Sequence, residues 1–161
     1  MYTREEVIQE SIKYFNGDKL AAETWEDKYA LKDEDNNILE KTPEDMHRRI
    51  SSEFARIEKK KFKNPLSEQE IFNLLDHFKY IVPQGSPMFG IGNPYQFISL
   101  SNCYTCSSPL DNYNSILDTD KQLVNISKRR GGCGISLDNL RPKNAKTKNA
   151  AGVAEVNQTL A

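Results

Sequence analysis

The chain has 161 residues, of which 22 are basic and 23 acidic, and its formal net charge is −1. With 37% apolar residues, it has the composition of one ordinary soluble domain. No apolar run reaches the roughly 18–20 residues that span a bilayer, and the N-terminus lacks the apolar stretch of a signal peptide, so membrane and secretory proteins are excluded. The near-zero charge and the lack of a wide basic stripe also disfavour a nucleic-acid binder.

Four helices are predicted before Pro83, and each has a capping signal at its start. A Ser or Thr followed three residues later by Glu can satisfy two free backbone N–H groups, and a proline suits the first turn of a helix. The four expected starts are Thr3, Asp18, Thr42 and Ser67. In the second helix, the side chains expected to share one face are those of Leu20, Ala21, Trp25, Lys28 and Tyr29.

The composition changes at Pro83, beyond which glycine and proline are frequent. We therefore expect a helical domain in residues 1–83 and a second domain in residues 84–161. Within the second domain, Phe97 to Thr105 is predicted as a buried strand, Asn112 to Lys128 as a helix and Gly134 to Leu137 as another strand. Because two strands cannot form a stable sheet, this β-α-β arrangement is expected to be the beginning of a larger sheet.

The three cysteines allow several kinds of chemistry. In a chain without a secretion signal, cysteines indicate a reducing, cytoplasmic compartment, where thiols serve metal, redox or packing roles more often than structural disulfides. Cys103 and Cys106 form a C-x-x-C pair, and Cys133 lies between glycines. A zinc site would need a fourth ligand, for which only His47 and His77 remain. A thioredoxin-type pair and simple packing of buried thiols are the other readings, and the pattern leaves all three open.

Residues 129–134, which read Arg-Arg-Gly-Gly-Cys-Gly, lie between the predicted helix and the second strand. Backbone N–H groups and guanidinium groups there could hold a phosphate, although the spacing is not that of a P-loop and a plain tight turn is the alternative. Asp111 and Arg141 could likewise be a ribose acceptor and a phosphate clamp, or a helix cap and a surface charge. The residues alone do not decide between these readings.

Six blocks of sequence, taken in order, resemble the N-terminal part of the ribonucleotide reductase catalytic chain. The resemblance runs from about Asp18 to Ala151. The amino-acid sequence of the blocks is closer to the cobalamin-dependent class and its relatives than to the iron-dependent enzyme with an N-terminal ATP cone. A cone is not expected here, since the first block begins at Asp18. The blocks are Asp18-Lys19-Leu20-Ala21-Ala22, Lys28-Tyr29-Ala30-Leu31, Thr42-Pro43-Glu44-Asp45-Met46, Gly85-Ser86-Pro87-Met88, Leu100-Ser101-Asn102-Cys103-Tyr104 and the run from Arg130 to Lys143 with its Gly-Gly-x-Gly and Leu-Arg-Pro motifs.

The resemblance implies an α+β fragment, in which a helical N-terminal domain precedes the first strands and helix of a ten-stranded α/β barrel. It also implies radical reduction of ribonucleotides to deoxyribonucleotides. No cofactor is expected to bind to this segment, and the radical source of the full enzyme would be adenosylcobalamin or a metal-containing partner subunit. The expected partners are the rest of the catalytic subunit, the ribonucleotide substrate, a deoxynucleoside triphosphate effector and a thioredoxin-like or dithiol reductant.

Site residues follow from the resemblance by position. Cys103 matches the first cysteine of the redox pair, whose thiols are oxidised to a disulfide as the ribose 2′-hydroxyl leaves as water, and Cys106 would then be a bystander. Ser86 and Asn102 match residues that contact the substrate. Asp111 resembles the acidic residue that holds the effector ribose, and Arg141 the arginine near its phosphates.

The helix at residues 112–128 resembles the one through which catalytic chains form homodimers, and the Gly131 to Gly134 loop would border the effector site. Residues 153–161 do not continue the family pattern, and the thiyl-radical cysteine, the second redox cysteine and most of the barrel are not in this sequence. We therefore expect the chain to be inactive by itself and to need the remaining barrel in trans. The alternative is a stand-alone deoxynucleotide-binding regulatory module without catalysis.

Overall fold

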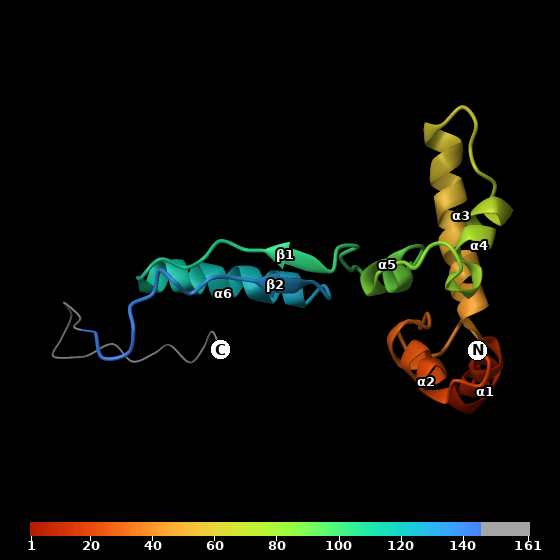
Figure 1. The fold of residues 1–161 in the computed structure, drawn as a ribbon, viewed down its shortest axis with the longest axis horizontal. Coiled ribbons are helices and arrows are strands. Elements are labelled where there is room, and N and C mark those ends of the chain that lie inside the picture. Colours follow the sequence, from red (N-terminus) through yellow and green to blue (C-terminus); the bar gives the residue numbers. More distant parts are fainter. Residues whose placement is uncertain (146–161) are drawn as a thin grey trace. The chain divides into compact units, whose positions relative to one another are not determined.

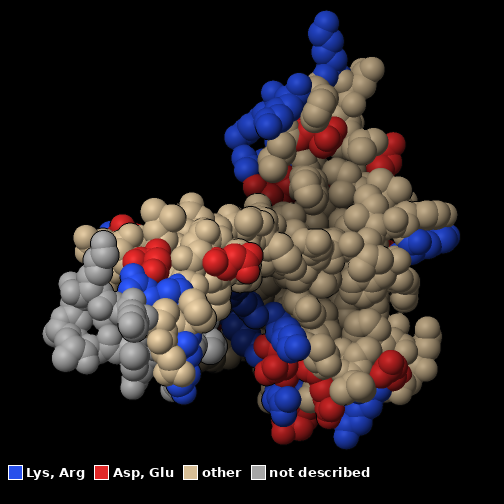
Figure 2. Space-filling model, turned by 60° about the vertical axis from the view of Figure 1, so that its left-hand side comes forward, with Lys and Arg blue, Asp and Glu red and all other residues tan. Residues whose placement is uncertain are grey.

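The computed structural model describes residues 1–145, which divide into two compact units, Met1–Leu100 and a second unit that begins at Ser101. Figure 1 shows helices α1 to α5 in the first unit and strands β1 and β2 with helix α6 in the second. Among the described residues, no helix has both the length and the apolar character to span a bilayer. Figure 2 shows acidic and basic side chains mixed in small groups, with a basic group at the end of α3, whose last turn holds lysines 59–61.

The four predicted helices are present and begin at the predicted caps. They are α1 (Arg4–Tyr14), α2 (Lys19–Lys28), α3 (Pro43–Lys61) and α4 (Glu68–Leu75). Thr3 and Ser67 both form complete capping boxes, and Asp18 accepts a hydrogen bond from the backbone N–H of Ala21 at 2.9 Å. The short helix η1 (Asp76–Phe78) follows α4 directly. Local side-chain chemistry therefore decides where these helices start.

The core of the first unit lies between α1, α2, α3 and α4. Its buried members include Val7, Trp25, Ala30, Ile38, Met46, Ile50, Ala55, Ile71 and Leu75. The predicted face of α2 is confirmed at Trp25, which is buried, but it is wrong at Leu20, which is 73% exposed, and at Lys28, which is also exposed. Ala22 and Glu26 are buried instead. Glu26 is tolerated there because Arg4 and Lys32 both bind its carboxylate, at 2.7 and 2.9 Å. The two ion pairs therefore compensate the burial of a charged side chain on α2.

Helix α5 (Gly85–Gly90) lies beyond the proline at which we expected the helical layer to end. It belongs to the first unit, since the division falls between Leu100 and Ser101. Arg49 of α3 holds α5 in place by donating to the carbonyl oxygens of Met88 and Ile91, while its Nε lies 2.7 Å from Glu40 Oε1. Arg49, whose side chain is nearly buried, thus connects α5 and Ile91 to α3, and local sequence patterns do not reveal this contact.

The second unit is a parallel β-α-β unit formed by β1 (Cys103–Thr105), α6 (Tyr113–Ser127) and β2 (Gly132–Gly134). Helix α6 confirms the predicted helix, with Asn112 as its N-cap. A Cβ at Gly131 would lie 2.6 Å from Ile126 Cγ2 and 2.8 Å from Tyr104 Cε2. The glycine therefore allows the close approach of helix and sheet that the turn into β2 requires.

Both predicted strands need correction. The first was expected as a buried strand over residues 97–105, but only its last three residues pair in a sheet, and Cys103 and Thr105 among them are exposed. Phe97 is 82% and Leu100 54% exposed. The second was expected at Gly134 to Leu137, and it lies two residues earlier. Periodicity identified apolar stretches correctly, but pairing depends on a partner strand at the right position, which apolar stretches alone do not specify.

Candidate functional site

Cys103 is a free, exposed thiol at the beginning of β1. Side chains alternate along a strand, so Cys103 points to the face opposite that of Tyr104. The ring of Tyr104 lies at Gly131 beside Ile126, which places α6 on the Tyr104 face. Cys103 consequently lies on the face of the two-stranded sheet that α6 does not cover.

Asn102 stands directly before this cysteine and is partly buried. Its carbonyl oxygen accepts a hydrogen bond from the backbone N–H of Gly132 at 2.7 Å. This bond sets the register in which Cys103 pairs with Gly132. The main chain of the predicted substrate residue thus fixes the position of the predicted redox cysteine.

The other two cysteines are joined, because Cys106 and Cys133 form a disulfide whose Cα atoms are 6.5 Å apart. The expectation that thiols would be preferred to a structural disulfide is therefore wrong for this pair. That Cys106 takes no part in the redox chemistry of Cys103 stays a prediction. The parallel pairing of β1 with β2 explains the bond, since it brings the two chain segments side by side. Among residues 1–145, no three side chains of the metal-binding types are grouped to hold a metal ion.

Asp111 and Arg141 are 30 residues apart in sequence, yet Arg141 Nε donates to Asp111 Oδ2 at 2.5 Å. Both side chains are about one-third exposed, so the pair is open to solvent. It lies next to the start of α6, where Asn112 accepts from the backbone N–H of Ser115 at 2.9 Å. The two predicted effector residues therefore meet within one unit, which combines an acceptor for hydroxyl groups with a donor for phosphate.

Ser86, the other predicted substrate residue, is buried on α5 in the first unit, whereas Asn102 and Cys103 belong to the second. Tyr29 approaches the neighbouring glycine closely, since a Cβ at Gly85 would lie 3.3 Å from the Tyr29 hydroxyl. The α5 backbone is thus packed directly on Tyr29, the residue that caps the C-terminus of α2.

A cluster around the Tyr14 hydroxyl was not predicted. This hydroxyl accepts from the backbone N–H of His77 at 2.7 Å, donates to Asp76 Oδ1 at 3.1 Å and lies 3.3 Å from His47 Nδ1. His47 is fully buried, and burial lowers its pKa to about 4. Burial likewise raises the pKa of Tyr14. Both histidines thus belong to a polar cluster of the helical unit, and no spacing rule connects residues so far apart in sequence.

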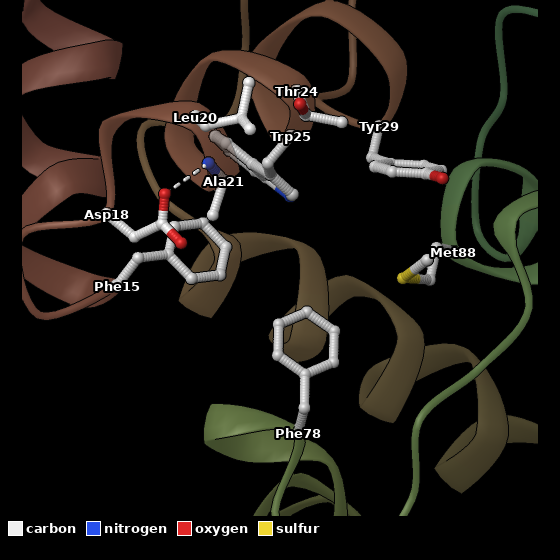
Figure 3. Close-up of a pocket in the computed structure, with 9 residues that line it drawn as sticks. All are labelled: Phe15, Asp18, Leu20, Ala21, Thr24, Trp25, Tyr29, Phe78 and Met88. Atoms are coloured by element: carbon white, nitrogen blue, oxygen red, sulfur yellow. Dashed lines mark hydrogen bonds between the residues drawn. The ribbon is translucent and has the colours of Figure 1, made fainter.

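A pocket of about 380 Å³ lies in the same unit. Figure 3 shows side chains from α2, α5, η1 and the end of α1 around it, most of them apolar. Asp18 lines the pocket as well, but one of its carboxylate oxygens is engaged in capping α2. The pocket residues are Phe15, Asp18, Leu20, Ala21, Thr24, Trp25, Tyr29, Phe78 and Met88.

Comparison with known protein families gives two matches that lie on either side of the division between the units. Residues 15–95 match the all-alpha domain of ribonucleotide reductase, and residues 101–158 match its barrel domain. The fold and the site therefore define a class of protein in which an all-helical domain is followed by the beginning of a barrel domain. The chain belongs to the ribonucleotide reductase family, as part of the large subunit.

Two curated relatives agree with this assignment. The ribonucleoside-diphosphate reductase large chain of Cryptosporidium parvum is 32% identical over 131 residues, which are 80% of this chain and 15% of the relative. The large subunit of the same name from Plasmodium falciparum (isolate FCR-3 / Gambia) is 28% identical over 85 residues, 53% of this chain and 10% of the relative. The chain thus spans less than a sixth of the length of the curated relatives it matches.

Proposed function

We propose that this chain is the N-terminal part of a ribonucleotide reductase catalytic subunit and supplies one of the two thiols that reduce the ribose. The observation that carries the proposal is the position of Cys103 on the uncovered face of β1. In an α/β barrel the helices lie outside the strands, so the face opposite α6 would line the barrel interior. Cys103 would then face the substrate.

The reaction would consume two thiols. Cys103 and a second cysteine from the remaining barrel are oxidised to a disulfide, the ribose 2′-hydroxyl leaves as water, and a hydrogen takes its place on carbon. A dithiol or thioredoxin-like reductant must then restore the thiols. Ser86 and Asn102 are proposed to contact the substrate, for which the names of the relatives favour a ribonucleoside diphosphate.

Radical generation belongs to parts of the enzyme outside this chain. The amino-acid sequence of the six blocks supports a relation to the cobalamin-dependent class. Adenosylcobalamin is therefore one proposed radical source, and a metal-containing partner subunit is the other. We propose no cofactor site in this segment.

The Asp111–Arg141 pair is proposed to bind the deoxynucleoside triphosphate effector. Asp111 would accept from a ribose hydroxyl, and Arg141 would donate to phosphate oxygens. A charge-assisted hydrogen bond contributes about 1.5–3 kcal/mol, so Asp111→Ala or Arg141→Ala should weaken effector binding by about one to two orders of magnitude. An unchanged dissociation constant in both variants, measured by calorimetry, would remove these residues from the site.

Helix α6 is proposed as the homodimer contact, and the structure sorts its apolar residues into two faces. Ile116 is buried against its own unit, and Leu123 is half-buried. Val124 is 64% exposed, as are Leu117 at 63% and Tyr113 at 77%. The exposed stripe is the face available to a second copy.

The central experiment is reconstitution of reductase activity from this chain and a fragment that holds the remaining barrel. Cys103→Ser should abolish multiple turnover with a dithiol reductant. The double variant Cys106→Ser/Cys133→Ser is the matched control and should remain active at saturating effector concentration. Equal losses in both variants, or stable binding of the two fragments without any ribonucleotide reduction, would contradict the proposal.

The Asp111–Arg141 pair, made entirely by one unit of this chain, also favours a second candidate, a regulatory module that binds deoxynucleotides without catalysis. Calorimetry with deoxynucleoside triphosphates, in the presence and absence of the partner fragment, separates the two. A catalytic part should bind more tightly once the partner completes the fold. A module should bind equally well alone.

A further inference from the structure

The segment that follows β1 is connected at three levels to the segment that begins within β2. We call this set of contacts, between residues 106–111 and 133–141, the seam. Next to the sheet, the segments share the disulfide, and the backbone N–H of Cys106 donates to the Gly134 carbonyl at 3.0 Å. Further along, the backbone N–H of Ser136 donates to Ser108 Oγ at 3.1 Å. The last contact of the seam is the ion pair between Asp111 and Arg141.

The disulfide is separate from the thiol of Cys103. Strand alternation places Cys106 on the same face as Tyr104, opposite Cys103, and Cys133 pairs with Tyr104 in the register of the sheet. Cys103 thus lies on the other side of the sheet from the bond. Cys133 is only partly buried, whereas Cys106 is 9% exposed, so a small thiol reagent would reach the Cys133 sulfur first.

We propose that Cys106 and Cys133 are a redox-controlled modification site that sets the affinity of the Asp111–Arg141 pair for a phosphorylated ligand. The inference about the ligand rests on the proposed function, whereas the redox couple itself does not. Asp111 lies five positions after Cys106, and Arg141 lies eight positions after Cys133. A covalent bond at the base of the seam therefore limits how far the two charged side chains can move apart.

The chemistry is thiol–disulfide exchange with a small disulfide such as oxidised glutathione. The Cys133 thiolate attacks one sulfur of glutathione disulfide, forms a mixed disulfide and releases one glutathione. The Cys106 thiolate then attacks the Cys133 sulfur and releases the second glutathione. Two cysteine thiols are oxidised to one disulfide, and one glutathione disulfide is reduced to two thiols, so electrons and protons balance.

Reduction would leave the seam with hydrogen bonds and a solvent-exposed ion pair, which are weak restraints. Part of the binding free energy of the ligand would then be used to order residues 107–111 and 135–141. Ordering a few side chains or a short loop is expected to weaken binding by about three- to tenfold. The oxidised chain should therefore be the tighter binder.

The first test is trapping of thiols in the whole chain. The protein is equilibrated in glutathione buffers of different ratio, alkylated with iodoacetamide and analysed by peptide mass spectrometry. The Cys106–Cys133 link should form in oxidising buffer and disappear in reducing buffer, with Cys103 alkylated in both. A disulfide that includes Cys103, or no disulfide at any ratio, would overturn the inference.

The second test is calorimetry with dTTP on the oxidised and the reduced chain. The reduced wild type should bind about three- to tenfold more weakly. Cys106→Ser/Cys133→Ser should match the reduced wild type in both buffers, and Cys103→Ser should respond to redox state as the wild type does. Equal affinity for dTTP in the oxidised and reduced states would refute redox control of binding but would not contradict the proposed effector site. No binding in either state, by the chain alone or with its partner fragment, refutes both.

Discussion

Acid sensitivity of the helical unit is a direct consequence of the buried His47. Its side chain has no exposed surface, and its Nε2 has no hydrogen-bond partner in the described structure. Burial lowers its pKa from 6.5 to about 4 in the folded chain. As pH falls through 6.5 the unfolded chain takes up a proton that the folded chain does not, so stability present above pH 6.5 is lost progressively down to about pH 4.

The size of the effect follows from the two pKa values. Full protonation linkage over this shift amounts to about 3 kcal/mol, and the part lost between pH 7.5 and pH 5 is about 2 kcal/mol. Between pH 7.5 and pH 5, most carboxylates contribute little to the change in stability. Glu6, Glu26 and Asp33 have pKa values lowered by hydrogen bonds and ion pairs, so their stabilisation is lost only at lower pH.

The assay is urea unfolding followed by tryptophan fluorescence. Trp25 is the sole tryptophan and donates to Met46 Sδ at 3.4 Å, next to His47, so it reports on this unit. His47→Asn should flatten the stability profile between pH 7.5 and pH 5 by about 2 kcal/mol. His77→Asn is the matched control, because Asn tolerates the positive φ of 52° at that position and His77 is exposed. The same pH dependence in wild type and His47→Asn would refute the argument.

Three further predictions concern packing and association. Gly131→Ala should destabilise the second unit by about 1–3 kcal/mol in denaturant unfolding, because the new methyl group collides with α6 and β1. Gly134→Ala is the control and should be nearly neutral. Equal effects of the two substitutions would count against the close approach of α6 and β1 at Gly131. Arg49→Met removes the ion-pair partner of the buried Glu40 carboxylate and should lower the free energy of unfolding by about 3–5 kcal/mol, measured by Trp25 fluorescence. A loss below about 1 kcal/mol would show that solvent replaces the ion pair. The chain should form a concentration-dependent dimer in sedimentation velocity, and Val124→Asp should shift it toward monomer while the exposed Asn125→Asp does not. A wild-type chain that stays monomeric at high micromolar concentration would refute the dimer.

The amino-acid sequence by itself determined where helices begin. Thr3, Asp18 and Ser67 cap helices through hydrogen bonds to residues three positions away, so the complete interaction is visible in a short stretch of sequence. Helix α6 was predictable for the same reason, since Asn112 caps it locally. The order of the sequence blocks also identified the family.

Only the tertiary structure decided which side chains meet. On α2, Glu26 is buried between two cations from other segments, whereas Leu20 is exposed. Cys106 and Cys133 join because parallel pairing of two short strands places them side by side, 27 residues apart in sequence. Such contacts depend on the relative position of whole elements, and local propensity contains no information about that position.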